Sequence, residues 1–200
     1  MNKSGMSSEE WSSLKDVFIG MIPRYDSINS RITFGLDERW RRMIAKESIG
    51  KDAVLEVGSG PGTLAVKLMS KKVYCLDPIP EMHKAAVKKI PEQDLERYEF
   101  ISGSAEFIPL TDDFTDVVFC AFSFRDFFDK PKGLKEIHRV LKPGGKIVIL
   151  DIAKHDGFYG HLIYFYINSV ASGFSGGRKE MKCLSETYKA FAPPKYYFDP

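Results

Sequence analysis

The chain has 200 residues, of which 44% are hydrophobic and 28% charged; this composition is typical of one globular domain and excludes a disordered, collagen-like or coiled-coil protein. Its 29 basic and 27 acidic residues leave a net charge of +2, so no overall positive field favours nucleic acid as a partner. The three cysteines are widely spaced and form no CxxC pair, which indicates reduced thiols in a cytoplasmic protein rather than a disulfide framework or a zinc cluster.

Residues 1–50 predict a helical cap that precedes the main fold. The amino terminus is polar and carries acids where a signal peptide needs an apolar stretch, in agreement with a cytoplasmic location. Ser7 and Glu10 have the spacing of a capping box for a first helix. Asp37 is placed to cap a second helix of this region.

Beyond residue 50, short β-rich apolar runs alternate with helical patterns, which predicts a parallel sheet. The fourth and fifth runs are continuously apolar, as expected of central strands that are covered on both faces. Only residues 103–115 join the third run to the fourth, so this connection is expected to be irregular or a single helical turn. We therefore expect an α/β fold that is Rossmann-like and doubly wound, with a mostly parallel sheet and helices on both faces. The expected organisation is one domain over residues 1–200, with its core at residues 51–154. The predicted strands are 53–57, 72–77, 98–102, 116–123 and 146–153.

Residues 155–200 do not continue this pattern and predict a divergent carboxy-terminal region that contacts the substrate. They include an apolar stretch over 161–171, which is far shorter than the roughly 20 residues that cross a bilayer. The basic residues Arg39, Arg41 and Arg42 indicate a solvated helix face, with attraction to anionic lipid as the alternative. Any membrane contact is therefore expected to be peripheral at most.

Three glycines, Gly58, Gly60 and Gly62, lie where the first predicted strand runs into a predicted helix. Residues without a Cβ let the backbone turn tightly and approach a ligand, and the start of a helix offers free N–H groups to a carboxylate or phosphate. In doubly wound sheets, ligands bind at this carboxyl end of the strands. The turn alone does not identify the ligand.

Two neighbouring residues discriminate between possible ligands. A dinucleotide fingerprint that begins at Gly58 needs glycine at position 63, where Thr63 stands, which disfavours NAD. Glu56 precedes the turn by two residues and would repel a pyrophosphate but attract a cation. S-adenosylmethionine combines a sulfonium and an ammonium with one carboxylate, so its charges suit an acid beside a helix start. The sequence therefore favours S-adenosylmethionine.

Asp77 ends the second predicted strand, roughly 20 residues after the start of the glycine turn. This is the expected position of an acid that accepts hydrogen bonds from both ribose hydroxyls. The alternative is that an acid before Pro78 merely caps a turn. The ribose role is favoured, because Glu56 and the three glycines precede Asp77 at the spacing expected of such a site.

The segment EVGSGPG fits the acid-x-Gly-x-Gly-x-Gly motif of the class I S-adenosylmethionine-dependent methyltransferases. Residues 21–154 resemble more narrowly the ubiquinone/menaquinone-biosynthesis C-methyltransferase family, through the segments YDSINSRITFGLDERWRR, LDPIPEM, GSAEFIPLTDDFTDVVFCAFSFRDFFDK and EIHRVLKPGGKIVILDIAK. The resemblance implies S-adenosylmethionine as the cofactor and S-adenosylhomocysteine as its product. It also implies a seven-stranded sheet of order 3-2-1-4-5-7-6, whose last two strands fall in an abbreviated carboxy-terminal region.

The resemblance also assigns roles to matching positions, with two departures. The family often has Asp or Asn where Ser104 stands, and its Gly-Leu-Arg-Asn stretch is Ser-Phe-Arg-Asp at residues 123–126. In the implied site, the methionine part of the cofactor faces Gly58, Gly60 and Gly62, and its ammonium group lies at Glu56. The ribose is held by Asp77 and flanked by Pro78 and Met82, and the adenine is contacted by Ser104 and Ala105. Beside the transferable methyl group the cofactor is lined by Ala121 and Phe122, and Tyr25 closes over the site.

Asp126 is the predicted general base. A quinol or phenol carbon reacts faster once the hydroxyl has lost its proton, and this needs a base within hydrogen-bond reach. Asp126 follows the fourth predicted strand, and Arg125 beside it would orient the base or stabilise a developing oxyanion. The alternative is that the two residues pair with each other or with the first helices. No spacing of His, Cys and acidic residues indicates a metal site.

As a whole, the sequence predicts an enzyme that methylates a small, aromatic or lipophilic acceptor. The favoured reaction is C-methylation of a quinone precursor such as demethylmenaquinol. One alternative is O- or N-methylation of another small metabolite. Another, of a different class, is a non-catalytic regulatory module that binds the cofactor. The sequence does not indicate an oligomeric state.

Overall fold

A computed structural model of the chain describes residues 8–152, 161, 165 and 166. These residues fall into two compact units, one of Glu38–Asp151 and one of Ser8–Asp37 with the described residues from Ile152 onward. The predicted organisation as one domain with a cap, a core and a substrate region stays a prediction. The helices are α1 (Ser8–Met21), α2 (Tyr25–Ile32), α3 (Leu36–Ala45), α4 (Pro80–Lys89) and α5 (Lys130–Val140), and the strands are β1 (Ala53–Val57), β2 (Lys72–Asp77), β3 (Tyr98–Ser102), β4 (Thr115–Ala121) and β5 (Leu141–Leu150).

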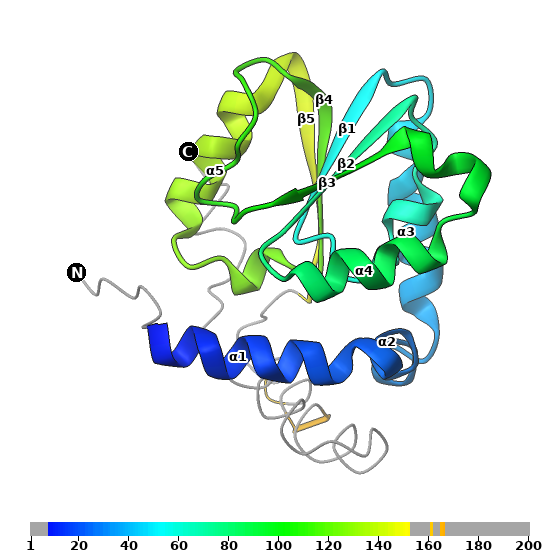
Figure 1. Ribbon diagram of the computed structural model, residues 1–200, viewed down its shortest axis with the longest axis vertical. Coiled ribbons are helices and arrows are strands. Elements are labelled where there is room, and N and C mark those ends of the chain that lie inside the picture. The colour runs from blue at the N-terminus through cyan, green and yellow to red at the C-terminus, as the bar shows by residue number, and fades with distance from the viewer. Residues whose placement is uncertain (1–7, 153–160, 162–164, 167–200) are drawn as a thin grey trace. The chain divides into compact units, whose positions relative to one another are not determined.

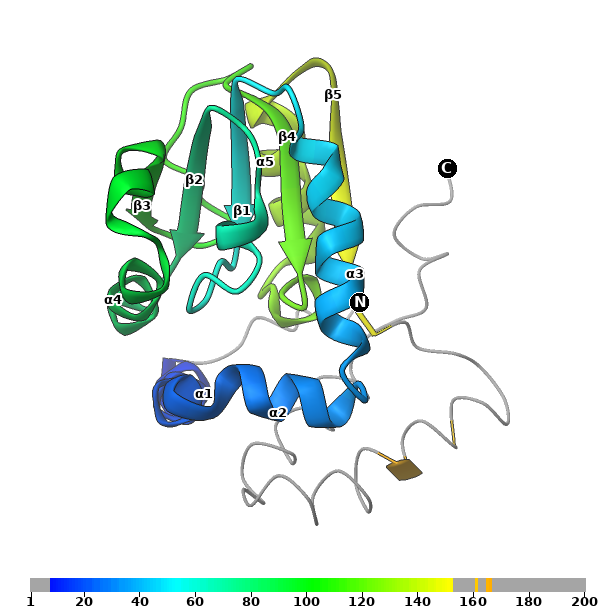
Figure 2. The ribbon, with the colours of Figure 1, turned by 90° about the vertical axis from the view of Figure 1, so that its right-hand side faces the viewer.

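The larger unit is built around these five strands, which are all parallel and lie in the order β3-β2-β1-β4-β5 (Figure 1). Helices α3 and α5 cover opposite faces of the sheet (Figures 1 and 2). The predicted α/β, doubly wound fold is confirmed, and β1, β2 and β3 have the predicted bounds. The order agrees with the first five strands of the implied seven, whose last two lie outside the described residues.

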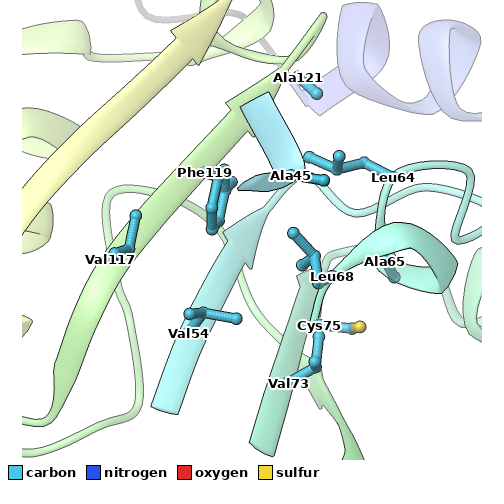
Figure 3. Packing of buried hydrophobic residues seen from close by; sticks show 10 residues of the cluster. All are labelled: Ala45, Val54, Leu64, Ala65, Leu68, Val73, Cys75, Val117, Phe119 and Ala121. Carbon is cyan, nitrogen blue, oxygen red and sulfur yellow. The ribbon is translucent and has the colours of Figure 1, made fainter. Parts of the chain in front are cut away.

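The core of this unit consists of the apolar runs that predicted the strands. On one face of the sheet, Val54, Val73 and Phe119 from β1, β2 and β4 pack against Leu64 and Leu68, which follow the glycine turn (Figure 3). Each of these five side chains is at most 2% exposed. Burial of one such side chain contributes about 1.5–3 kcal/mol, so the packing holds the carboxyl ends of the strands in a fixed register.

The fourth and fifth strands differ from the predicted bounds. β4 ends at Ala121 rather than at residue 123, because Phe122 turns the chain with a φ of 61°. β5 begins at Leu141 rather than at residue 146 and contains a bulge, in which Gly144 has a φ of 77°. The connection between β3 and β4 contains turns and one isolated bridge but no helix, which confirms the predicted irregular connection.

Two predictions about helices are wrong. The segment after the glycine turn forms only the 3-10 turn Ala65–Lys67, in place of the expected α-helix. Residues 58–71 alone join β1 to β2, close to the minimum of about 12 residues for a parallel crossover, which leaves little length for a helix. Asp37 is the second residue of α3 rather than its cap, because the Thr33 hydroxyl accepts the Asp37 N–H at 3.2 Å and so takes the capping role.

The smaller unit contains α1 and α2. The Tyr166 hydroxyl donates to the carbonyl oxygen of Ile32 at 3.2 Å, and its ring centroid lies 5.5 Å from that of Phe34. The predicted capping box needs Ser7, which lies outside the described residues, and of the predicted carboxy-terminal region 155–200 only residues 161, 165 and 166 are described. None of the described helices is long and apolar enough to cross a membrane.

Candidate functional site

The carboxyl ends of β1, β2 and β4 meet at the glycine turn. The N–H groups of Gly58 and Ser59 donate to the carbonyl oxygen of Leu76 at 2.8 and 3.0 Å, which ties the turn to β2. Gly58 has a φ of 69°, and a Cβ there would lie 2.5 Å from the Cβ of Ser123, so only glycine fits. Gly60 has a φ of 52°, and a Cβ there would meet no described atom within 4 Å. Gly58 therefore lets the strands pack, whereas the space beside the Cα of the buried Gly60 holds no described atom.

Glu56 of β1 is a buried carboxyl, 1% exposed, beside this turn. The N–H of Ala65 donates to the carboxylate, but Oε2 accepts no hydrogen bond from any described residue. Burial raises the pKa of Glu56 to about 8; the charge of Arg41 opposes this shift, and that of Asp77 adds to it. A buried carboxylate with an oxygen that lacks a partner is stabilised by a cationic ligand.

Arg41 does not lie on a solvated helix face, as was expected from the sequence. Its side chain is 2% exposed, and its guanidinium carbon lies 4.7 Å from the centre of the Phe122 ring. Arg39 and Arg42 are exposed, in agreement with the expectation. Arg41 differs from them because it lies one helical turn before the buried Ala45, on the stripe of α3 that packs against the sheet. It brings a cation close to Glu56.

Asp77 is 6% exposed, and both of its oxygens accept hydrogen bonds. Oδ2 accepts the N–H of Gly60 at 2.8 Å, and Oδ1 accepts the N–H of Ile79 at 2.9 Å. Burial raises its pKa to about 6, and the two hydrogen bonds limit this shift. Asp77 therefore caps the following turn, as the alternative held, and also fixes the glycine turn. A carboxylate has about four acceptor positions, so two remain for further hydrogen bonds, and the ribose role stays a prediction.

The other predicted cofactor residues differ in burial. Gly62 packs closely on α4, where an added Cβ would lie 2.8 Å from the Cβ of Ala86. Tyr25 belongs to the smaller unit, so its closure over the site stays a prediction. Met82, Ala105, Ala121 and Phe122 are at most 6% exposed, whereas Pro78 and Ser104 are half-buried.

A second group of charges follows β4, in the 3-10 turn Phe124–Asp126. The Arg125 N–H donates to Asp151 Oδ2 at 3.1 Å, and the Arg125 guanidinium pairs with Asp151 Oδ1. Its Nε lies 3.9 Å from Asp126 Oδ1, which is beyond hydrogen-bond distance. The predicted alternative, a pair between Arg125 and Asp126, is thus the weaker of these two contacts of the guanidinium.

The Asp126 carboxyl has the properties of a general base near neutral pH. Its side chain is 20% exposed. Burial raises its pKa to about 6; Arg125 and Lys130 lower the pKa, and Asp151 raises it. Such a carboxylate is ionised at pH 7 yet binds a proton more strongly than an ordinary aspartate. Its role as the base stays a prediction.

Two charged residues of the site were absent from the predicted set. Asp151 directly follows β5, so it stands at the carboxyl end of a parallel strand as Asp77 does, and this position could have identified it. Arg41 is four residues from both Asp37 and Ala45, which are 4% and 1% exposed. This helical spacing was the available signal for its burial.

The sequence matches the ubiE/COQ5 methyltransferase family over residues 5–192. It is 31% identical over 202 residues to a demethylmenaquinone methyltransferase of Deinococcus radiodurans, across 96% of this chain and 83% of the relative. It is 33% identical over 193 residues to a demethylmenaquinone methyltransferase of Thermus thermophilus, across 90% of this chain and 86% of the relative. Among solved structures it is similar to a putative methyltransferase from Bacillus halodurans, with a TM-score of 0.58 and 27% identity over 68% of this chain and 61% of that one.

Proposed function

The chain belongs to the ubiE/COQ5 methyltransferase family and is an S-adenosylmethionine-dependent methyltransferase, and we propose that it methylates a ring carbon of a quinone precursor such as demethylmenaquinol. The names of the relatives from Deinococcus radiodurans and Thermus thermophilus support this acceptor. The structural observation that carries the proposal is the buried Glu56 carboxyl, which has an oxygen without a described partner and precedes the glycine turn, where an added Cβ at Gly60 would meet no described atom within 4 Å.

The described residues fit S-adenosylmethionine. Glu56 would receive the ammonium group, Gly60 would lie against the methionine part, and Asp77 would accept the ribose hydroxyls. No α-helix begins after the glycine turn to receive the carboxylate of the cofactor, so the buried positive charge of Arg41 would bind this carboxylate instead. When bound, the cofactor supplies a methyl group on a positively charged sulfur, and a nucleophile that attacks this methyl group displaces the sulfur as a neutral thioether. Within the larger unit, the remaining contacts would come from Gly58, Gly62, Pro78, Met82, Ser104, Ala105, Ala121 and Phe122.

On the acceptor side, Asp126 would take the proton from a quinol hydroxyl and so raise the electron density of the ring. A pKa of about 6 matches this task, because the group is ionised at pH 7 and still has appreciable basicity. Arg125 places a positive charge next to the developing oxyanion. Ala121 and Phe122 present apolar surface at the end of β4, which would exclude water from the reacting atoms.

Two measurements on the full chain test the proposal. Calorimetric titration with S-adenosylmethionine is expected to show binding, which Glu56→Gln weakens and the matched control Glu47→Gln, at an exposed ion pair with Lys146, leaves unchanged. Transfer of labelled methyl groups is then compared across demethylmenaquinol, a phenol and an amine, and the methylated atom is identified by NMR.

Carbon methylation of the quinol supports the proposal. Transfer only to oxygen or nitrogen would replace it by the alternative acceptor class. Binding without turnover on any acceptor would favour a regulatory module, and absence of binding would refute the assignment of the cofactor site.

A further inference from the structure

Asp151 connects the end of β5 to the turn that carries Asp126. Its side chain is 4% exposed, and its two oxygens take the backbone N–H and the guanidinium of Arg125. One residue earlier, the carbonyl oxygen of Leu150 accepts the N–H of Phe122 at 2.6 Å. Two successive residues at the end of β5 thus fix the turn after β4.

The charges that face Asp126 come from three elements. Arg125 lies between two carboxylates and is bound by Asp151, with its Nε 3.9 Å from Asp126 Oδ1. Lys130 of α5 directs its ammonium to the carbonyl oxygens of Arg125 and Phe127, at 2.9 and 3.2 Å. Both cations near Asp126 therefore have acceptors other than its carboxylate.

We propose that Asp151 is a positioning residue for methyl transfer, because it holds the Arg125 guanidinium away from Asp126 and keeps the Asp126 carboxylate available to accept a proton. This inference rests on the proposed function, in which Asp126 is the base. Without the charge of Asp151, the guanidinium has the Asp126 carboxylate as a neighbouring anion and can bind it through two nitrogens. A proton acceptor held in this way is a weak base.

The residue types in the turn support this arrangement. Asp126 directly follows Arg125, so the two opposite charges would form a hydrogen-bonded pair unless another carboxylate binds the arginine. Asp151 meets that need from the neighbouring strand, and its negative charge also raises the pKa of Asp126.

The test compares Asp151→Asn with Asp151→Glu and with the control Asp112→Asn, which removes an exposed carboxylate from Arg139. Asparagine still accepts the Arg125 N–H, so the turn is expected to fold, and circular dichroism checks this. The Asp126 carboxyl is titrated by carbon NMR without acceptor, its signal being identified with Asp126→Asn. The pH profile of kcat is measured with the quinol.

In Asp151→Asn, we expect the Asp126 titration and the acidic limb of kcat to move down by about one pH unit or more, as an opposite charge within 4–6 Å produces. The kcat plateau is expected to fall about tenfold, as for a weakened general base, while cofactor affinity stays unchanged. Asp151→Glu is expected to restore both pH values, and the control to leave them unchanged.

An Asp126 titration that stays at its wild-type position in Asp151→Asn overturns the inference, as does an equal shift in the control. Because the NMR titration needs no acceptor, it separates the two proposals. A shifted titration in a protein that methylates no acceptor would support the charge arrangement and refute the proposed function.

Discussion

The buried Glu56 carboxyl should make cofactor binding strongly dependent on pH. With a pKa of about 8 it is mostly protonated at pH 6 to 7. Over the same interval the amino group of the cofactor is mostly protonated, since an α-amino group has a pKa of about 7.7–8.0. Binding of this ammonium at an ionised Glu56 requires the carboxyl to lose its proton, so affinity should rise with pH.

The size of the effect follows from the two acids beside the glycine turn. Between pH 6 and 7, the ionised fraction of a group with a pKa of about 8 rises about ninefold, equivalent to about 1.3 kcal/mol of binding free energy. Asp77, with a pKa of about 6, adds a factor of about two. The wild-type dissociation constant should therefore fall roughly 15- to 20-fold, whereas Glu56→Gln should keep only the roughly twofold change due to Asp77.

Calorimetry at pH 6, 6.5 and 7, in buffers of different ionisation enthalpy, measures both the affinity and the protons released. Glu47→Gln provides a control, because it makes the same substitution in an exposed side chain that pairs with Lys146. It should keep the wild-type slope. A wild-type affinity that is flat over this range, or a Glu56→Gln variant with the full slope, would refute the reasoning.

Four further substitutions probe the site. Asp77→Ala should weaken cofactor binding tenfold or more while the circular dichroism spectrum is retained, since charged hydrogen bonds contribute about 1.5–3 kcal/mol each; an unchanged affinity in a titration contradicts the ribose role. Asp126→Asn should lower kcat by about 10²–10⁴ at constant cofactor affinity, and an unaltered rate would discard the base. Gly58→Ala should lower the melting temperature more than Gly60→Ala, because the new Cβ at position 58 would lie 2.5 Å from the Cβ of Ser123. Gly60→Ala should chiefly weaken cofactor binding. A larger loss of melting temperature in Gly60→Ala would contradict the assigned roles.

The strands that were predicted with correct bounds are those that end where the local chemistry changes. β2 stops at Asp77, before Pro78, which has no N–H to donate to a ladder. β5 could not be predicted in the same way, because its first residues include a proline and Gly144, which normally end a strand. Pairing with β4 keeps them in the sheet as a bulge, and this depends on contacts distant in sequence.

Some charged residues of the site were predictable from the local sequence, but others were not. Glu56 and Asp77 are marked by a motif and by the end of a strand. Whether a charge such as Arg41 lies toward water or toward the sheet depends on how α3 packs. The run of arginines does not show this, and the only local signal is the helical spacing of Arg41 from Ala45. The pairing of Arg125 with Asp151 joins the turn after β4 to the residue that follows β5. The end of the strand marks Asp151 as a candidate, but the local sequence does not identify Arg125 as its partner.

The charges of the site, more than its glycines, determine which cofactor is suitable. A dinucleotide needs free N–H groups at a helix start for its pyrophosphate, and here the chain forms only a 3-10 turn after the glycines. The same pyrophosphate would meet Glu56, whose charge is already disfavoured by burial and by Asp77. An ammonium group reverses both effects, because it stabilises the ionised carboxylate that the folded protein otherwise keeps protonated. Arg41 offsets only part of the free energy lost by burying Glu56, so a bound cation stabilises its carboxylate further, and this favours S-adenosylmethionine.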